Sequence, residues 1–182
     1  MGILGASVRF ARRCVLALVL VAGVPVHAQE VSLEYQLKAA YLFNFLKFVE
    51  WPPDGESGPF TLCVAGRNPF GDVLTETLRN ETVNARALTT RVIVRPDSGC
   101  RVVFLPQGTA PTPYLRAARG SPILTVGEAP GFIAQGGIIN FVREEGTIRF
   151  QINAREAARA ELRISSHLLR LARVSPDRYD EP

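Results

Sequence analysis

The sequence predicts an α/β fold, a single-domain sandwich in which helices flank a mixed, mostly parallel central sheet and a C-terminal β-hairpin and helices complete the chain. Two observations support this prediction. Short apolar runs alternate with helical patterns over most of the chain after residue 28, and such runs indicate strands buried on both faces. After residue 136, apolar and polar residues alternate around a glycine-containing turn, which is typical of a hairpin. No repeat or linker divides the chain, so we expect one domain over residues 29–176 and a polar tail over 177–182.

The first 28 residues are predicted to be a cleaved secretory signal peptide. Arginines without any acid precede an almost entirely apolar run from Cys14 to Val26, and the small-residue pattern Val26-His27-Ala28 marks the cleavage site. The apolar run is shorter than a bilayer requires, so a membrane-spanning helix is disfavoured. Cleavage leaves 154 residues, enough to bury one core, and predicts a periplasmic protein without a membrane span.

The charge of the mature chain does not favour a nucleic-acid partner. The full sequence has 21 basic and 17 acidic residues, a net charge of +4, and three of the basic residues lie in the signal segment. The net charge of the mature chain is therefore close to zero. A nearly neutral protein lacks the basic field that nucleic acids select, so we expect none as a partner.

The segment from Leu33 to Glu50 is predicted to be a helix. At about 100° per residue, its apolar side chains cover one broad arc that we expect to face the core. These side chains are Leu37, Ala39, Tyr41, Leu42, Phe45, Leu46, Phe48 and Val49. Pro52 and Pro53 end the helix, because the residue before a proline avoids the helical conformation.

Three residues of this segment and the tryptophan that follows it are not explained by a purely structural helix. Glu34 and Lys38 lie inside the apolar arc, four positions apart, where they can form an ion pair. Phe43 lies on the polar side, and Trp51 stands at the helix exit. Phe43 and Trp51 are therefore the predicted interface residues, with Phe43 expected to contact either a second element or a partner subunit.

The remaining elements follow from shorter patterns. Four apolar runs predict strands over 59–65, 91–94, 101–105 and 123–126, with helices over 70–79 and 113–119 and a loop or short helix over 132–135. The hairpin strands are expected over 137–142 and 147–153, and Gly136-Gly137 opens them as a bulge or turn. Asn153 is predicted to cap a helix over 154–159. Ser165 begins the last helix, whose inward side chains are Leu168, Leu169 and Ala172.

Cleavage leaves two cysteines, Cys63 within a predicted strand and Cys100 at the start of another. An exported chain meets an oxidising compartment, so a disulfide between them is favoured over two separately buried thiols. It would close a loop of roughly 38 residues and add about 4 kcal/mol of stability in the chain-entropy relation. Neighbouring strands are close enough for this bridge, but the strand register decides it, and the sequence leaves the register open.

The residues offer little for catalysis. A zinc site needs several histidines or cysteines at short spacing, and the mature chain has one histidine, His167, and two distant cysteines. Ser165 and Ser166 are adjacent to His167 on a predicted helix, so the three point in different directions and form no triad. Glu144 and Glu145 lie in the hairpin turn, where we expect them to be solvated. The sequence therefore predicts no enzyme, no catalytic residue, no metal and no cofactor.

The loop from Gly66 to Gly71, with the sequence GRNPFG, is the candidate ligand site. It follows a predicted strand and precedes a predicted helix, an arrangement that suits an anion. It has neither the lysine of a Walker loop nor the GxGxxG spacing. The predicted ligand-binding residues are Gly66, Arg67, Asn68 and Gly71, with Arg67 as the cation. The alternative is a tight turn in which Gly71 and Asp72 begin the helix.

Six motifs in one order resemble the YfiR/HmsC-like family of exported regulators over nearly the whole mature chain. They are KAAYLFNFLKFVEWP at 38–52, NPFG at 68–71, CRVVFLP at 100–106, ILTVGE at 123–128, GGIINFV at 136–142 and RFQINAREAARAELRISSHLLRLA at 149–172. The spacing of Cys63 and Cys100 is similar to that of the family's disulfide. Some members carry a second cysteine pair near the hairpin, and this sequence has none.

The resemblance implies a periplasmic α/β protein, often dimeric, that binds the periplasmic sensory domain of an inner-membrane diguanylate cyclase. It implies that binding holds the cyclase inactive, which lowers cyclic di-GMP and biofilm formation. The alternative hypothesis is a periplasmic small-molecule-binding module with its pocket at residues 66–71. A chain without a catalytic constellation agrees with either function.

Overall fold

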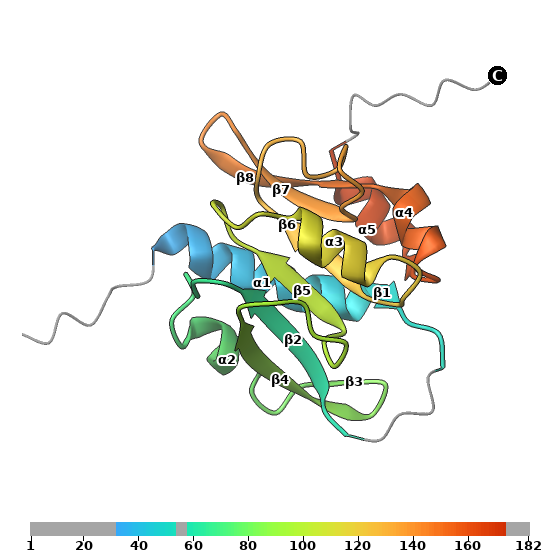
Figure 1. Ribbon diagram of the computed structural model, residues 1–182. Helices are drawn as coiled ribbons and strands as arrows, with labels where there is room; N and C mark the ends of the chain where they lie inside the picture. The colour runs from blue at the N-terminus through green and yellow to red at the C-terminus, as the bar shows by residue number, and fades with distance from the viewer. Residues whose placement is uncertain (1–31, 54–57, 174–182) are drawn as a thin grey trace, which may run out of the picture.

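The computed structural model describes residues 32–53 and 58–173 and is built around a seven-stranded sheet (Figure 1). The strand order is β3-β4-β2-β5-β6-β7-β8. The strands are β2 (Phe60–Ala65), β3 (Thr82–Val83), β4 (Arg86–Ile93), β5 (Val102–Leu105), β6 (Leu124–Gly127), β7 (Ile139–Glu144) and β8 (Thr147–Ile152). The five central strands run parallel, and β3 and β8 pair antiparallel at the two edges. The predicted fold class, a mixed and mostly parallel sheet between helices, is confirmed.

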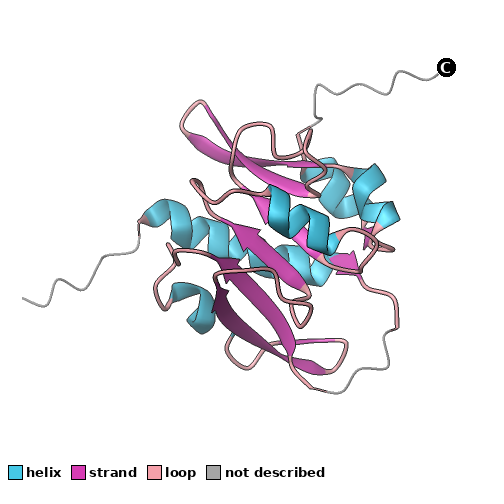
Figure 2. Ribbon diagram, in the orientation of Figure 1, coloured by secondary structure: helices cyan, strands magenta, loops and turns pink. Residues whose placement is uncertain are grey.

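Helices cover the two faces of the sheet unequally (Figures 1 and 2). One face carries the larger core, to which α1, α2, α4 and α5 contribute buried side chains. Their bounds are α1 (Leu33–Phe48), α2 (Val73–Leu78), α4 (Ala154–Arg159) and α5 (Ser166–Leu171). The other face carries a smaller core under α3 (Thr112–Ala118) and the connection over residues 128–138. The sheet therefore separates two cores.

The first helix fills the larger core much as its apolar arc predicts. Ala39, Leu42, Phe45 and Leu46 are buried against the sheet. The helix ends two residues earlier than predicted, because the chain becomes extended at β1 (Val49–Glu50) and pairs antiparallel with β9 (Arg163–Ile164). This two-stranded ribbon joins the end of α1 to the connection between α4 and α5.

Several elements have different bounds from those expected. The strand β4 begins five residues before its predicted start, and the short strands β1, β3 and β9 were not predicted. Residues 132–135 form turns and no helix. Asn153 caps α4, since its side chain accepts a hydrogen bond from the backbone N–H of Glu156 at 3.1 Å. Ser165 caps α5 through the N–H of Leu168 at 3.2 Å.

Two leucines that were expected in the core are exposed. Leu37 retains 42% of its accessible surface because Lys38, one position on, takes the inward position at that level of α1. Leu169 retains 41%, because Leu168, the preceding residue on α5, faces the core and adjacent helix positions point about 100° apart. Both predictions of an inward side chain were wrong.

The two glycines that open the hairpin have different roles. Gly136 has a φ of 97°, a conformation that L side chains rarely adopt. At Gly137 the reason for glycine is steric. A Cβ there would collide with the ring of Phe132, which is buried in the smaller core. A Cβ on Gly127 at the end of β6 would also stand 2.6 Å from that ring. Two glycines thus make room for one phenylalanine.

The predicted signal peptide and the polar tail lie outside the described residues. Over residues 32–53 and 58–173, no helix has the length and apolar character that crossing a bilayer requires.

Candidate functional site

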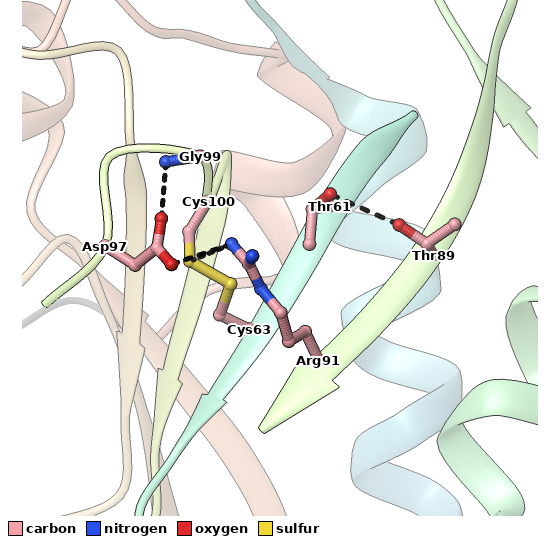
Figure 3. The surroundings of a disulfide bond; sticks show 7 residues. All are labelled: Thr61, Cys63, Thr89, Arg91, Asp97, Gly99 and Cys100. Carbon is pink, nitrogen blue, oxygen red and sulfur yellow. Dashed lines mark hydrogen bonds and ion pairs between the residues drawn. A yellow bond between two sulfur atoms is a disulfide. The ribbon is translucent and has the colours of Figure 1, made fainter. Parts of the chain in front are cut away.

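Cys63 and Cys100 form a disulfide on the α3 face of the sheet (Figure 3). Their Cα atoms are 5.7 Å apart. Cys63 lies in the middle of β2, opposite Val103 of β5 and Arg91 of β4, and Cys100 lies just before β5. Parallel strands bring positions on neighbouring strands within the separation that a disulfide spans, so this register makes the bond possible. Both cysteines are completely buried, which removes them as nucleophiles.

The side chain of Arg91, from β4, extends past the disulfide to Asp97 in the turn that precedes Cys100 (Figure 3). The Arg91 Nη2 atom lies 3.0 Å from Asp97 Oδ2 and 3.9 Å from the sulfur of Cys100. The other carboxylate oxygen of Asp97 accepts a hydrogen bond from the N–H of Gly99 at 2.8 Å. The turn between β4 and β5 is thus tied to β4 by an ion pair and to β2 by a covalent bond.

A buried ion network lies at the carboxyl ends of the parallel strands. Lys38 of α1, 4% exposed, donates to Glu34 at 2.5 Å and to Glu128, which follows β6. Glu34 also pairs with Arg143 of β7. The predicted pairing of Glu34 with Lys38 is present, and the second acid explains why a lysine can occupy the apolar face: its charge is compensated twice.

The carboxylate of Glu128 is held by two more donors. The Tyr35 hydroxyl donates to Oε1 at 2.8 Å, and the backbone N–H of Gln107 donates to the same atom at 2.7 Å. Burial raises the pKa of the Tyr35 phenol, and the hydrogen bond and charge of Glu128 raise this pKa further. The positive charge of Arg67 lowers the pKa of the Tyr35 phenol. Glu128 therefore joins α1 to the loops that follow β5 and β6.

The loop from Gly66 to Gly71 lies at the point where the chain connections diverge. β2 is flanked by β4 on one side and β5 on the other. The connection after β2 passes through α2 on one face, whereas that after β5 passes through α3 on the other. In open α/β sheets, ligands bind in the crevice that such a switch leaves at the carboxyl ends. Arg67 is exposed here, close enough to influence the Tyr35 phenol.

The four predicted ligand residues of this loop differ in what they do. Asn68 closes the loop on itself, because its side chain accepts from the N–H of Phe70 at 3.0 Å and donates to the carbonyl of Gly71 at 2.9 Å. Gly66 and Gly71 have φ values of 75° and 53°, so both serve the turn. Arg67 has no side-chain partner among the described residues. The helix that follows, α2, has six residues, which is too short for a strong anion site of its own.

The two predicted interface residues lie at different depths. Phe43 is half-buried against the larger core, and the Lys47 Nζ atom lies 4.0 Å from its ring centre. Trp51 is 9% exposed, and its ring meets Phe60 edge-on with centroids 4.9 Å apart. The indole N–H of Trp51 has no partner within the described residues. In the free chain Trp51 is thus mostly a core residue, while Phe43 keeps an accessible edge.

No constellation for catalysis or metal binding is found within residues 32–53 and 58–173. No three His, Cys, Asp or Glu side chains gather there to share a metal ion. His167 is exposed, with its ring 5.0 Å from that of Phe48. Glu144 pairs with Arg173 at 2.8 Å on the surface of the hairpin.

Glu128 is the residue that sequence analysis missed. It ends the apolar motif ILTVGE, and an acid at the carboxyl end of a buried parallel strand is the signal that could have identified it. For its partner Lys38, the sequence predicted a pairing with Glu34 alone. The two lie 90 positions apart, so no local pattern connects them.

The sequence pattern of the YfiR/HmsC-like family matches residues 35–173, from the first turns of α1 to the end of the described chain. No curated protein matches the sequence. The family match includes the helix, the disulfide and all strands of the sheet. Since it covers well over half of the sequence, the chain belongs to the YfiR/HmsC-like family, whose members are periplasmic, non-enzymatic regulators of cyclic di-GMP signalling.

Proposed function

We propose that this protein is exported by an N-terminal signal peptide and represses an inner-membrane diguanylate cyclase by binding its periplasmic sensory domain. Repression lowers cyclic di-GMP and with it biofilm formation. The observation that carries this proposal is the family match over residues 35–173. The lack of a metal cluster among the described residues and the burial of both cysteines agree with action by binding rather than by catalysis.

Two further features belong to the same proposal. The active form is a homodimer or becomes one on binding, with the accessible edge of Phe43 among the contacts. The disulfide sets the stability of the regulator, so the redox state of the periplasm determines how much folded repressor is present.

A direct binding measurement tests the proposal. The oxidised protein is titrated calorimetrically with the periplasmic domain of the membrane signalling protein encoded beside it, and cyclic di-GMP is measured in cells with and without the regulator. We expect saturable binding and a lower cyclic di-GMP level when the regulator is present. If no neighbouring periplasmic domain binds, repression by direct contact is wrong.

A second candidate function is a small-molecule-binding module at the loop of residues 66–71. The observation that favours it is the position of this loop at the switch point, with the exposed Arg67 beside the Glu128 network. A ligand there could adjust partner affinity by binding two states of the protein differently.

Thermal stability in the presence of nucleotide and amino-acid metabolites tests this second function. A true ligand raises the melting temperature of the wild type and not of Arg67→Ala, while Arg116→Ala, on the outer side of α3, serves as the matched control. If no metabolite stabilises the protein and Arg67→Ala regulates normally, the loop is only a turn.

A further inference from the structure

Strand β4 is open along most of one edge. Strand β3 pairs only with Arg86 and Ala87, and the next residue, Leu88, donates its N–H to the carbonyl of Glu81 at 3.0 Å. On its other side β4 pairs with β2 from Leu88 to Ile93. Beyond Leu88, no segment of the described chain pairs with the outer side of β4. The stretch from Thr89 to Ile93 is therefore a free sheet edge.

The direction of the backbone groups along this edge follows from two hydrogen bonds. The carbonyl of Ile93 accepts from the N–H of Gly66 at 2.7 Å, so Ile93 turns its polar groups toward β2. In a parallel pair these groups alternate in direction from one residue to the next. Thr90 and Val92 therefore point their N–H and C=O groups outward, and the outward N–H of Leu88 agrees with this alternation. An added strand would find two donors and two acceptors in register.

Apolar side chains accompany these open groups. Val92 is 51% exposed and Val94 is 86% exposed, two of the six large apolar side chains that are exposed in the described parts of the chain. The hydroxyl of Thr90, in contrast, is held by Thr75 of α2 at 2.7 Å. Helix α2 thus contacts β4 at Thr90 but does not cover Val92. A strand added beside β4 would cover the Val92 side chain.

The charges of the edge decide what kind of strand fits. Arg91 lies at the middle of the free stretch with 48% of its side chain exposed, and Asp97 at 3.0 Å offsets part of its charge. Arg95 follows as an exposed cation without a side-chain partner among the described residues. A second copy paired antiparallel over the same stretch would place Arg91 opposite Arg91, and like charges in that position are destabilising. An acidic residue in the same position would be attracted, because Arg91 and Arg95 together carry one more charge than Asp97 compensates.

We propose that the edge from Thr89 to Ile93 docks an extended segment of the partner protein, with alternating apolar and acidic side chains, as an eighth strand. The apolar residues lie beside Thr90 and Val92, and an acidic one lies opposite Arg91. This rests on the proposed function, because it assigns the surface through which the regulator holds the periplasmic domain of its signalling partner.

Designed peptides test the edge without the partner. The isotope-labelled, oxidised protein is titrated by NMR with a capped eight-residue peptide of alternating valine and glutamate, and with the valine–lysine counterpart. We expect the glutamate peptide to shift the amide signals around Thr90 and to bind at least tenfold more tightly than the lysine peptide. If neither peptide shifts these signals, or both bind equally, the proposal is wrong.

Two substitutions at Val92 separate docking from folding. Val92→Pro removes an outward N–H that the β2 ladder does not use, and Val92→Lys keeps the N–H but adds a charge. We expect Val92→Pro to weaken the glutamate peptide at least tenfold and Val92→Lys to bind it at least as well as the wild type. Leu171→Lys, a change at another exposed apolar residue, should alter nothing. Unchanged peptide binding by Val92→Pro with an intact circular dichroism spectrum overturns the proposal.

The partner titration distinguishes the two proposals. If the wild type and Val92→Pro bind the periplasmic domain equally, the edge is not the docking surface and the repressor function stands. If the glutamate peptide binds the edge but no periplasmic domain does, the repressor function fails on its own. Self-association of the wild type in sedimentation, abolished by Val92→Pro, would assign the edge to a second copy and overturn the partner strand.

Discussion

Lys38 and Glu128 form a buried ion pair that joins the middle of the first helix to the end of the fourth parallel strand in the sheet. Their side chains are 4% and 5% exposed and lie 90 positions apart in the sequence. Buried charges are costly unless each one is compensated. The pair therefore fixes how α1 lies across the carboxyl edge of the sheet, beside the candidate ligand loop.

Removing the lysine should destabilise the fold. Lys38→Met leaves the Glu128 carboxylate with only neutral donors, and we expect the free energy of unfolding to fall by about 3–5 kcal/mol in urea denaturation. The double variant Lys38→Met/Glu128→Gln should lose less than the sum of the single variants. Lys47→Met, on the exposed side of the same helix, is the control and should cost less than about 1 kcal/mol. Strict additivity would show that the two charges do not depend on each other.

The disulfide should account for a defined part of the stability under oxidising conditions. We expect Cys63→Ser to have a lower free energy of unfolding than the wild type. This difference between the two proteins should narrow by about 4 kcal/mol when reductant is added. The reductant removes the same cross-link from the wild type, whereas the buried hydroxyl of the variant costs the same in both conditions. Denaturation curves with and without reductant give this difference. A gap that is independent of reductant would contradict a stabilising bond.

Tyr35 should make stability depend on pH in the alkaline range. Its pKa is raised in the folded protein above the unfolded value of 10.0, so the folded state holds the phenolic proton more tightly. The contribution is therefore complete below pH 10 and is lost as the pH rises toward the folded pKa. We expect the stability difference between wild type and Tyr35→Phe to shrink from about pH 10 upward. A difference that stays constant between pH 8 and pH 11, read by chemical denaturation, would argue against the buried contact with Glu128.

Phe132 and its two glycines should behave as one unit. Gly137→Ala places a methyl group in the ring of Phe132, and we expect a loss of at least about 1–3 kcal/mol, as for other overpacked cores. Phe132→Leu in the same chain should restore part of the loss, because the smaller side chain vacates the space. Gly146→Ala, where φ is 78° and a Cβ would meet nothing within 4 Å, measures the cost of backbone strain without collision. If Phe132→Leu restores none of the loss in Gly137→Ala, collision with the ring is not its cause.

The parallel core of this fold was predictable because its signal is local. Each of the runs PFTLCVA, RVVFL and the stretch from Ile123 is apolar on both faces, and each forms a strand within one or two residues of its predicted bounds. The polar strand β4 was found only in part. Its exposed positions, such as Thr89 and Arg91, break the apolar run from which buried strands are identified.

The candidate site was less predictable because it is assembled over long distances. The loop of residues 66–71 could be identified from its glycines, but its place at the switch point follows from the strand order, which no local pattern contains. Leu37 illustrates the same limit on a single helix. A helical arc predicts which residues share a side, whereas the neighbour that α1 meets at this level, Glu128, decides that Lys38 and not Leu37 turns inward.

The burial of both sulfur atoms sets an order of events for a folding chain. Each cysteine is completely enclosed between the sheet and α3, where no oxidising enzyme can reach it. An enzyme can therefore join the two sulfur atoms only before the layer of α3 closes over them. A chain that closes this layer too early traps two thiols that no oxidase can join, and it must open again before it can mature. Oxidation of the cysteines and closure of the smaller core therefore compete in time.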